Sequence, residues 1–116
     1  MERTVPCAAL RELVADNAKI VLLDVRRRPA FDADPVLIPG AVWQDPEQVG
    51  TWALKIGRDR PVVAYCVHGH EVSRGVVDRL RALGIEAALL EGGIEGWKTA
   101  GGAVTPLGAD RPAQAG

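Results

Sequence analysis

One segment decides the fold and the chemistry expected of this chain, and it reads Val63-Ala64-Tyr65-Cys66-Val67-His68-Gly69-His70-Glu71-Val72-Ser73-Arg74-Gly75. It begins with an uninterrupted apolar run, which is typical of a parallel strand that is covered on both faces. Cys66 stands where the strand stops, a short polar loop follows, and Ser73 is placed to cap a helix. The segment therefore predicts a strand, a loop and a helix, with a cysteine at the first junction.

The same alternation of short apolar runs and helical patterns continues on both sides of this segment. The expected strands are 20–23, 61–65 and 87–90, with a weaker one at 41–43. The expected helices lie near 10–17, 45–57, 73–84 and 94–100. Strands that alternate with helices favour an α/β layer fold with a mostly parallel sheet.

Length and composition indicate one ordinary globular domain. The chain has 116 residues, of which we assign 1–103 to the domain and 104–116 to a Gly-, Ala- and Pro-rich tail that is loose or draped on the surface. Its 14 basic and 15 acidic residues argue against binding to nucleic acid or an anionic membrane through bulk charge. With no membrane-spanning run and no secretory signal, we expect a cytoplasmic protein.

The position of Cys66 suggests a nucleophile. Ligands of open parallel sheets bind at the carboxyl ends of the strands, where this cysteine is expected. The N–H groups of a short loop and the start of a helix favour negative charge there, and the thiolate is the nucleophilic form of cysteine. On this pattern alone, a small buried apolar residue is an equally good interpretation of Cys66. We expect Cys7, in the first helix, to be a packing residue and both thiols to be free.

Three further motifs resemble, in the same order along the chain, the signatures of the rhodanese family. They are Leu22-Leu23-Asp24-Val25-Arg26, Ile38-Pro39-Gly40-Ala41 and Leu90-Glu91-Gly92-Gly93-Ile94-Glu95-Gly96-Trp97. The resemblance implies a three-layer α/β/α domain with a central, mostly parallel sheet. It also implies a sulfurtransferase in which Cys66 accepts a sulfane sulfur from thiosulfate or a persulfide and passes it, as a persulfide, to a thiol or cyanide, with no cofactor.

The resemblance also implies a set of site residues. They are Cys66, the cysteine loop formed by Val67, His68, Gly69, His70, Glu71, Val72 and Ser73, and the nearby Asp24 and Arg26, which we expect to hold that loop. We expect Arg27 and Arg28 to be solvated. The partners implied are a small anionic sulfur donor and a thiol or cyanide acceptor, with no nucleic acid and no membrane, while the oligomeric state is left open.

Two departures from the family pattern bear on the substrate. The chain between Phe31 and Ile38 is longer than usual, with Leu37 where a histidine is common, and we expect only a changed surface loop there. The cysteine loop is one residue longer, as in phosphatases and arsenate reductases of this fold. An oxyanion enzyme is therefore an alternative, although Val72 stands six positions after the cysteine, where phosphatases need an arginine.

A third departure is that His68, His70 and Glu71 replace the arginines or lysines often found in this loop. A protonated histidine would stabilise a thiolate and attract an anion, but solvated histidines are an equally simple interpretation. Glu71 is expected to face solvent.

Cys66 and the two histidines are ligand types for soft metals, yet three ligands on one short loop do not make a dependable site, so no metal is expected. A non-catalytic binding or sensor module is the remaining alternative.

Overall fold

Parallel strands form the centre of the molecule. The computed structural model describes residues 3–106, and its main sheet has the strand order β1-β6-β5-β2-β4 with every neighbouring pair parallel. These strands are β1 (Thr4–Val5), β2 (Val21–Asp24), β4 (Val42–Trp43), β5 (Val62–Tyr65) and β6 (Ala87–Leu90). A small antiparallel pair is formed by β3 (Val36–Leu37) and β7 (Thr105–Pro106).

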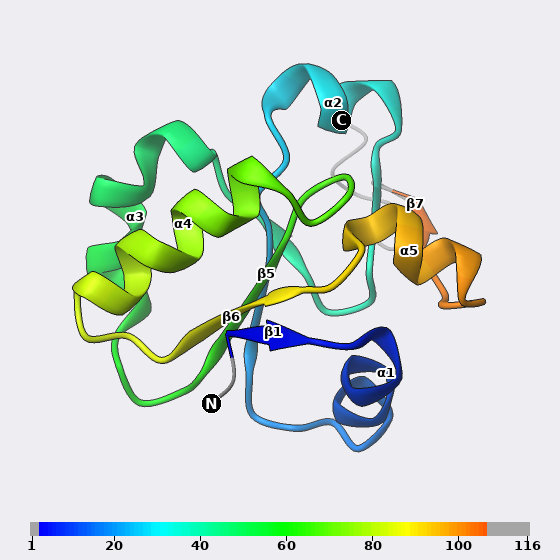
Figure 1. The fold of residues 1–116 in the computed structure, drawn as a ribbon, viewed down its shortest axis with the longest axis horizontal. Coiled ribbons are helices and arrows are strands. Elements are labelled where there is room, and N and C mark those ends of the chain that lie inside the picture. The colour runs from blue at the N-terminus through cyan, green and yellow to red at the C-terminus, as the bar shows by residue number, and fades with distance from the viewer. Residues whose placement is uncertain (1–2, 107–116) are drawn as a thin grey trace, which may run out of the picture.

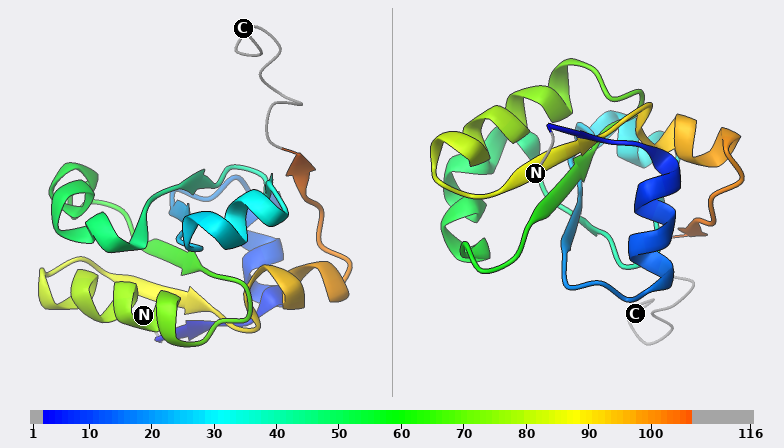
Figure 2. Two further views of the ribbon diagram at one scale, coloured as in Figure 1. Left: turned by 90° about the horizontal axis from the view of Figure 1, so that it is seen from above. Right: turned by 60° about the horizontal axis from the view of Figure 1, so that its bottom comes forward.

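Helices cover both faces of the main sheet (Figures 1 and 2). One face packs against α3 (Val49–Ile56), which the turn η1 (Pro46–Gln48) precedes, and α4 (Glu71–Ala82); the other packs against α1 (Cys7–Ala15) and α5 (Gly93–Thr99). Successive strand residues alternate between the two cores, so that Leu23 and Ala64 contact the first and Leu22 and Val63 the second. The predicted three-layer α/β/α domain with a mostly parallel sheet is confirmed.

Because the strands are parallel, their carboxyl ends lie along one edge of the sheet. Asp24 and Tyr65, the last residues of β2 and β5, are paired in register. The Val25 N–H extends this pairing by donating to the Tyr65 carbonyl over 2.8 Å. The connection from β5 to α4 leaves the sheet at this edge, close to the helix α2 (Arg28–Ala33), as Figure 1 shows. The edge therefore carries the cysteine loop.

The segment between Phe31 and Ile38 is more than the changed surface loop that we expected. Its start belongs to α2, and β3 follows and pairs with β7. The carbonyl oxygens of Asp34 and Val36 accept hydrogen bonds from the buried guanidinium of Arg26, so the segment is part of the support for that side chain. Two-residue strands and a six-residue helix are too short to show a hydrophobic period, which explains why the sequence did not predict them.

The predicted helix cap at Ser73 is wrong. α4 begins at Glu71, His70 is its N-cap residue, and Ser73 lies within the first turn. The Ser73 side chain is fully buried, and its hydroxyl oxygen accepts a hydrogen bond from the Cys66 thiol instead of capping the helix. In the predicted tail, Thr105 and Pro106 form β7, and residues 107–116 lie outside the described residues. Within residues 3–106, no helix has the length and apolar character needed to cross a bilayer.

Candidate functional site

Cys66 is the first residue after β5, and its side chain lies at the floor of a pocket at the carboxyl edge of the sheet. The residue is only 5 % exposed, and its thiol is free and donates to the Ser73 hydroxyl over 3.1 Å. A sulfur atom in this position is shielded from bulk solvent, yet a small molecule that enters the pocket can reach it.

The pocket has a volume of about 420 Å³ and two walls. One wall comes from the chain that follows β2, and the other from the cysteine together with its loop. Its lining residues are Arg26, Arg27, Ala30, Cys66, Val67, His68, His70, Glu71 and Val72. Three of the site residues predicted from the sequence, Asp24, Gly69 and Ser73, do not line the pocket. Asp24 and Ser73 bond to Arg26 and Cys66, which do line it, and Gly69 shapes the backbone of the loop.

The backbone of the cysteine loop is held by the start of α5. The carbonyl oxygens of Cys66 and Val67 accept hydrogen bonds from the N–H groups of Ile94 and Glu95, over 2.9 and 3.0 Å. Gly93 makes this approach feasible, since a Cβ atom there would lie 2.4 Å from the Val67 carbonyl oxygen, and the residue has a φ of +62°. The second glycine of the closing motif is thus explained by contact with the cysteine loop.

Gly69 brings the middle of the loop close to the same motif. It has a φ of +77°, and a Cβ atom there would lie 3.0 Å from the Gly92 nitrogen and the Leu90 oxygen. Among the described residues, the backbone N–H groups of residues 67–70 donate to no acceptor, and the first three N–H groups of α4 have no partner within the helix. Two consecutive stretches of backbone donors therefore remain available for an anion beside the sulfur.

Asp24 and Arg26 form a buried ion pair at the base of the pocket. Arg26 Nη2 lies 2.6 Å from Asp24 Oδ2, and Nε lies 3.0 Å from the same oxygen. Nη1 and Nη2 also donate to the carbonyl oxygens of Asp34 and Val36, so all three guanidinium nitrogens are engaged. The hydrogen bonds of the pair hold the segment 34–36, and not the cysteine loop directly as the sequence led us to expect.

The two arginines that follow differ from each other. Arg28 pairs with Asp32 over 2.9 Å and lies 5.3 Å from the centre of the Trp43 ring. Arg27 is exposed as predicted, but it also lines the pocket, which sequence analysis missed. Its side chain makes no hydrogen bond or ion pair with the described residues. Its place directly after the Arg26 motif, at the carboxyl end of a strand, is the signal that would have identified it.

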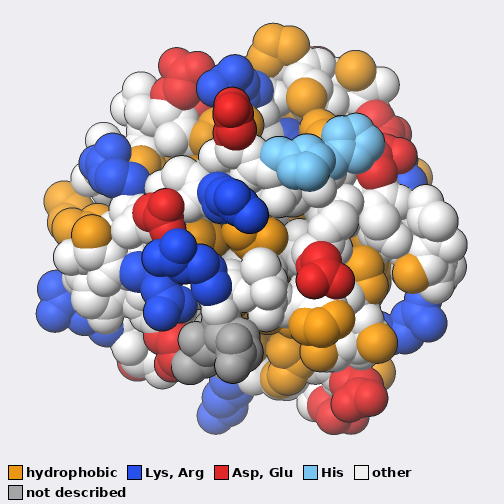
Figure 3. All heavy atoms as spheres, in the orientation of Figure 1, with side chains coloured by type: hydrophobic (Ala, Val, Ile, Leu, Met, Phe, Trp, Pro, Cys, Tyr) orange, Lys and Arg blue, Asp and Glu red, His pale blue; other side chains and the backbone are white. Residues whose placement is uncertain are grey.

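The two histidines lie together at the mouth of the pocket. They are the only histidines of the chain, and Figure 3 shows their imidazoles side by side on the surface, with ring centres 6.1 Å apart. Glu71, which follows them, is exposed as expected and also lines the pocket. No group of three metal-ligating side chains occurs within residues 3–106.

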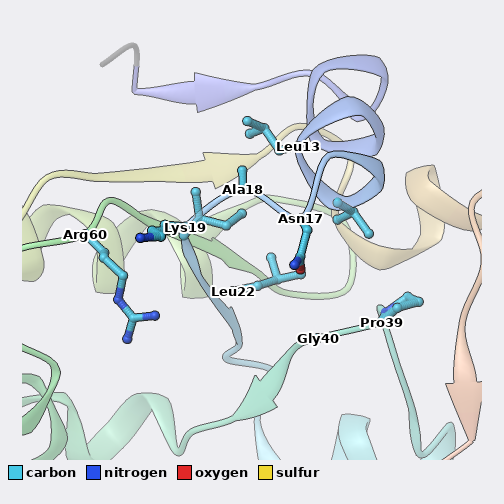
Figure 4. Close-up of a pocket in the computed structure, with 10 residues that line it drawn as sticks. Leu13, Asn17, Ala18, Lys19, Leu22, Pro39, Gly40 and Arg60 are labelled. Atoms are coloured by element: carbon cyan, nitrogen blue, oxygen red, sulfur yellow. The ribbon is translucent and has the colours of Figure 1, made fainter.

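A larger cavity lies at the opposite edge of the sheet. Its volume is about 540 Å³, and Figure 4 shows Lys19 and Arg60 on one side of it and Pro39 on the other. Its lining residues include no cysteine, histidine or acidic side chain. Without a nucleophile or a general base it offers no comparable chemistry, so the smaller cysteine pocket is the candidate site.

The other cysteine has different surroundings. Cys7 is half-buried, and its thiol donates to the Glu91 carbonyl oxygen over 3.6 Å. Burial, and next the negative charge of Glu91, raise the pKa of the Cys7 thiol, while Arg11 opposes them. Cys7 is therefore held in its protonated form, consistent with the packing role predicted for it.

Comparisons with known proteins bear on the family and the fold. The family model of the Rhodanese-like domain matches residues 7–100. A rhodanese-related protein from Thermoplasma volcanium is 26 % identical, with a TM-score of 0.77 over 90 % of this chain and 98 % of that one. A full-length protein from Lactobacillus plantarum is 25 % identical, with a TM-score of 0.82 over 90 % and 88 %.

A third similar structure shows the fold alone. It is a protein of unknown function from Rhodopseudomonas palustris, described as a possible tyrosine phosphatase, and it is 23 % identical with a TM-score of 0.77 over 88 % of this chain and 83 % of that one. No curated protein matches the chain.

Proposed function

Because the chain belongs to the Rhodanese-like domain family, we propose that it is a sulfurtransferase in which Cys66 carries the transferred sulfur. The observation that supports this most directly is the free Cys66 thiol at the floor of a pocket, next to a loop whose N–H groups have no other acceptor among the described residues. An anionic sulfur donor needs these elements: a nucleophile, and donors for the negative charge.

The reaction has two displacement steps. The Cys66 thiolate attacks the outer sulfur of thiosulfate or of a persulfide; the S–S bond of the donor breaks, and sulfite or a thiolate leaves with the electron pair. The sulfur is now held as a Cys66 persulfide. A thiolate or cyanide then attacks the outer sulfur, breaks the new S–S bond and restores the Cys66 thiolate. Electrons balance without an external oxidant or reductant.

Ser73 and the loop backbone assist at defined atoms. The Ser73 hydroxyl accepts from the thiol now and can rotate to donate to the thiolate, because a hydroxyl is both donor and acceptor. The N–H groups of residues 67–70 can bind the negative charge of the donor or of the persulfide. His68 and His70 at the pocket mouth add positive charge when protonated.

The test is intact-mass spectrometry after incubation with thiosulfate or a persulfide. We expect the wild-type protein to gain one sulfur, about 32 Da, and to lose it on addition of cyanide or a thiol. Cys66→Ser should gain nothing. Cys7→Ser is the matched control, since it removes the chain's other thiol, and it should gain sulfur like the wild type. Sulfur gain by Cys66→Ser, or its loss in Cys7→Ser, would contradict the assignment.

The lengthened loop and the pocket volume of about 420 Å³ favour one second candidate, an oxyanion enzyme. Two observations oppose it. Val72 lines the pocket at the position where a phosphatase needs an arginine, and every guanidinium nitrogen of Arg26 is already bonded within the protein. We therefore expect negligible hydrolysis of aryl phosphates and negligible reduction of arsenate. Turnover of either, together with no sulfur gain by the wild type, would reverse the order of the two candidates.

A further inference from the structure

The pocket is lined by one arginine that has no partner among the described residues. Arg26 is bonded through all its guanidinium nitrogens, and Arg28 pairs with Asp32 and lies over Trp43. Arg27, between them, lines the pocket and makes no hydrogen bond or ion pair with the described residues. A free guanidinium beside a nucleophile suits a carboxylate, which it binds through two parallel hydrogen bonds.

A free negative charge lines the same pocket. Glu71 is exposed, and its carboxylate likewise has no partner among the described residues. A doubly charged anion such as thiosulfate would be attracted by Arg27 and repelled by Glu71. A molecule that carries both an ammonium and a carboxylate would be attracted by both side chains.

The remaining lining and the size of the pocket indicate an organic body. Ala30, Val67 and Val72 contribute apolar surface, and the volume of about 420 Å³ lies within the roughly 300–1,000 Å³ typical of sites for small organic ligands. Thiosulfate has five heavy atoms and no apolar part, so it leaves most of this space and all of this apolar surface unused.

From the two charges, the apolar lining and the volume of the pocket, we infer that the sulfur donor is a low-molecular-weight persulfide of an amino acid or short peptide. Its carboxylate is bound by Arg27 and its ammonium by Glu71. This rests on the proposed sulfurtransferase function and names its substrate class. The Cys66 thiolate attacks the outer sulfur of R–S–SH, the S–S bond breaks, and R–S⁻ leaves with the electron pair while the proton stays on the transferred sulfur. A cysteine persulfide within a protein chain has neither charge at its own backbone and lacks this recognition.

Four short persulfides that carry different charges test the inference on the full-length protein. Cysteine persulfide carries both a carboxylate and an ammonium. Mercaptopropionate persulfide carries the carboxylate alone, cysteamine persulfide the ammonium alone, and mercaptoethanol persulfide neither. The measured quantity is the second-order rate at which Cys66 gains sulfur, followed by intact mass. Arg27→Ala should slow transfer about tenfold from the two carboxylate donors and less than twofold from the neutral one. Glu71→Gln should slow transfer about tenfold from the two ammonium donors alone.

Arg28→Ala is the matched control, because it removes the neighbouring positive charge that does not line the pocket. It should transfer sulfur from all four donors at the wild-type rate. Equal slowing of all four donors by Arg27→Ala, or no difference between Arg27→Ala and Arg28→Ala, would overturn the inference while leaving the sulfurtransferase intact. No transfer from any donor to the wild-type protein would instead overturn the function on which the inference rests.

Discussion

The amino and carboxyl edges of the main sheet each have a cavity, but only the cavity at the carboxyl edge is a candidate site. The amino edge has the larger cavity, about 540 Å³, lined by exposed cations and apolar side chains. The carboxyl edge has a cavity of about 420 Å³, yet it also has the three buried polar or charged residues of the described chain, Asp24, Arg26 and Ser73. The volume of a cavity therefore did not identify the candidate site. The buried, hydrogen-bonded polar residues beside it did.

The difference has a physical origin in the parallel sheet. Every strand delivers its carboxyl end to the same edge, so the loops after β2 and β5 and the start of α5 meet there. Buried polar groups are costly unless they are bonded, and within residues 3–106 no buried side-chain polar atom lacks a partner. Here Asp24 and Arg26 are bonded to each other and to segment 34–36, and Ser73 is bonded to Cys66.

The largest expected effect compares a glycine from each edge. Gly93 at the carboxyl edge and Gly40 at the amino edge both have positive φ, but a Cβ atom would lie 2.4 Å from the Val67 oxygen at Gly93 and meets no atom within 4 Å at Gly40. Gly40→Ala should cost about 1–2 kcal/mol for the backbone conformation alone. Gly93→Ala should cost about 5 kcal/mol or more and prevent folding or displace the cysteine loop.

Urea unfolding of both variants measures this difference, with sulfur gain at Cys66 as a second readout. A Gly93→Ala protein that is insoluble while Gly40→Ala folds supports the same conclusion. Equal free energies of unfolding for the two variants would show that the contact between α5 and the cysteine loop is not required.

The next effect compares two arginines. Arg26→Met leaves the fully buried Asp24 carboxylate without its partner, and we expect the free energy of unfolding to fall by about 3 kcal/mol. Arg60→Met at the amino edge removes an exposed side chain and should change stability by less than about 0.5 kcal/mol. The double variant Asp24→Asn, Arg26→Met should recover part of the loss in chemical denaturation. A single-variant loss as small as that of Arg60→Met would show that the ion pair stabilises little.

The smallest effect concerns the phenol of Tyr65, which accepts a hydrogen bond from the Ile38 N–H over 3.2 Å. Burial, and next the charge of Asp24, raise the pKa of Tyr65 well above its ordinary value. A raised folded-state pKa means that this contribution to stability is complete below the unfolded value of about 10 and is lost as the pH rises above it. Above pH 10, the stability of wild type should therefore fall more steeply than that of Tyr65→Phe, by up to about 1.4 kcal/mol per pH unit.

Urea unfolding at several alkaline pH values measures these slopes. Tyr65 is the chain's only tyrosine, so the ultraviolet absorbance of tyrosinate reports this group alone. Ionisation of the folded protein at the ordinary pH, or identical slopes in the two proteins, would contradict the raised pKa.

The sequence by itself determined the layers of the fold and the position of the cysteine. The apolar runs at 20–23, 61–65 and 87–90 are long enough to show that they are buried on both faces, and each became a strand of the main sheet. Cys66 stands at the end of one of them, and its place at the carboxyl edge follows from parallel pairing. Local patterns carry this information because a strand and its neighbouring helix are each specified within a few residues.

Only the tertiary structure decided which side chains reach the sulfur. Ser73 has the sequence position of a helix cap, yet it bonds to Cys66 because α4 begins two residues earlier. The family motif set Arg26 apart from Arg27 and Arg28, but the sequence did not distinguish the last two. In the structure Arg26 forms a buried ion pair, Arg27 a pocket wall and Arg28 a surface pair, according to what lies opposite each one. The groups opposite Arg26 include segment 34–36, whose sequence has no recognisable hydrophobic period. Local sequence patterns do not contain contacts between distant segments. The surroundings of the sulfur were therefore decided by the folded chain.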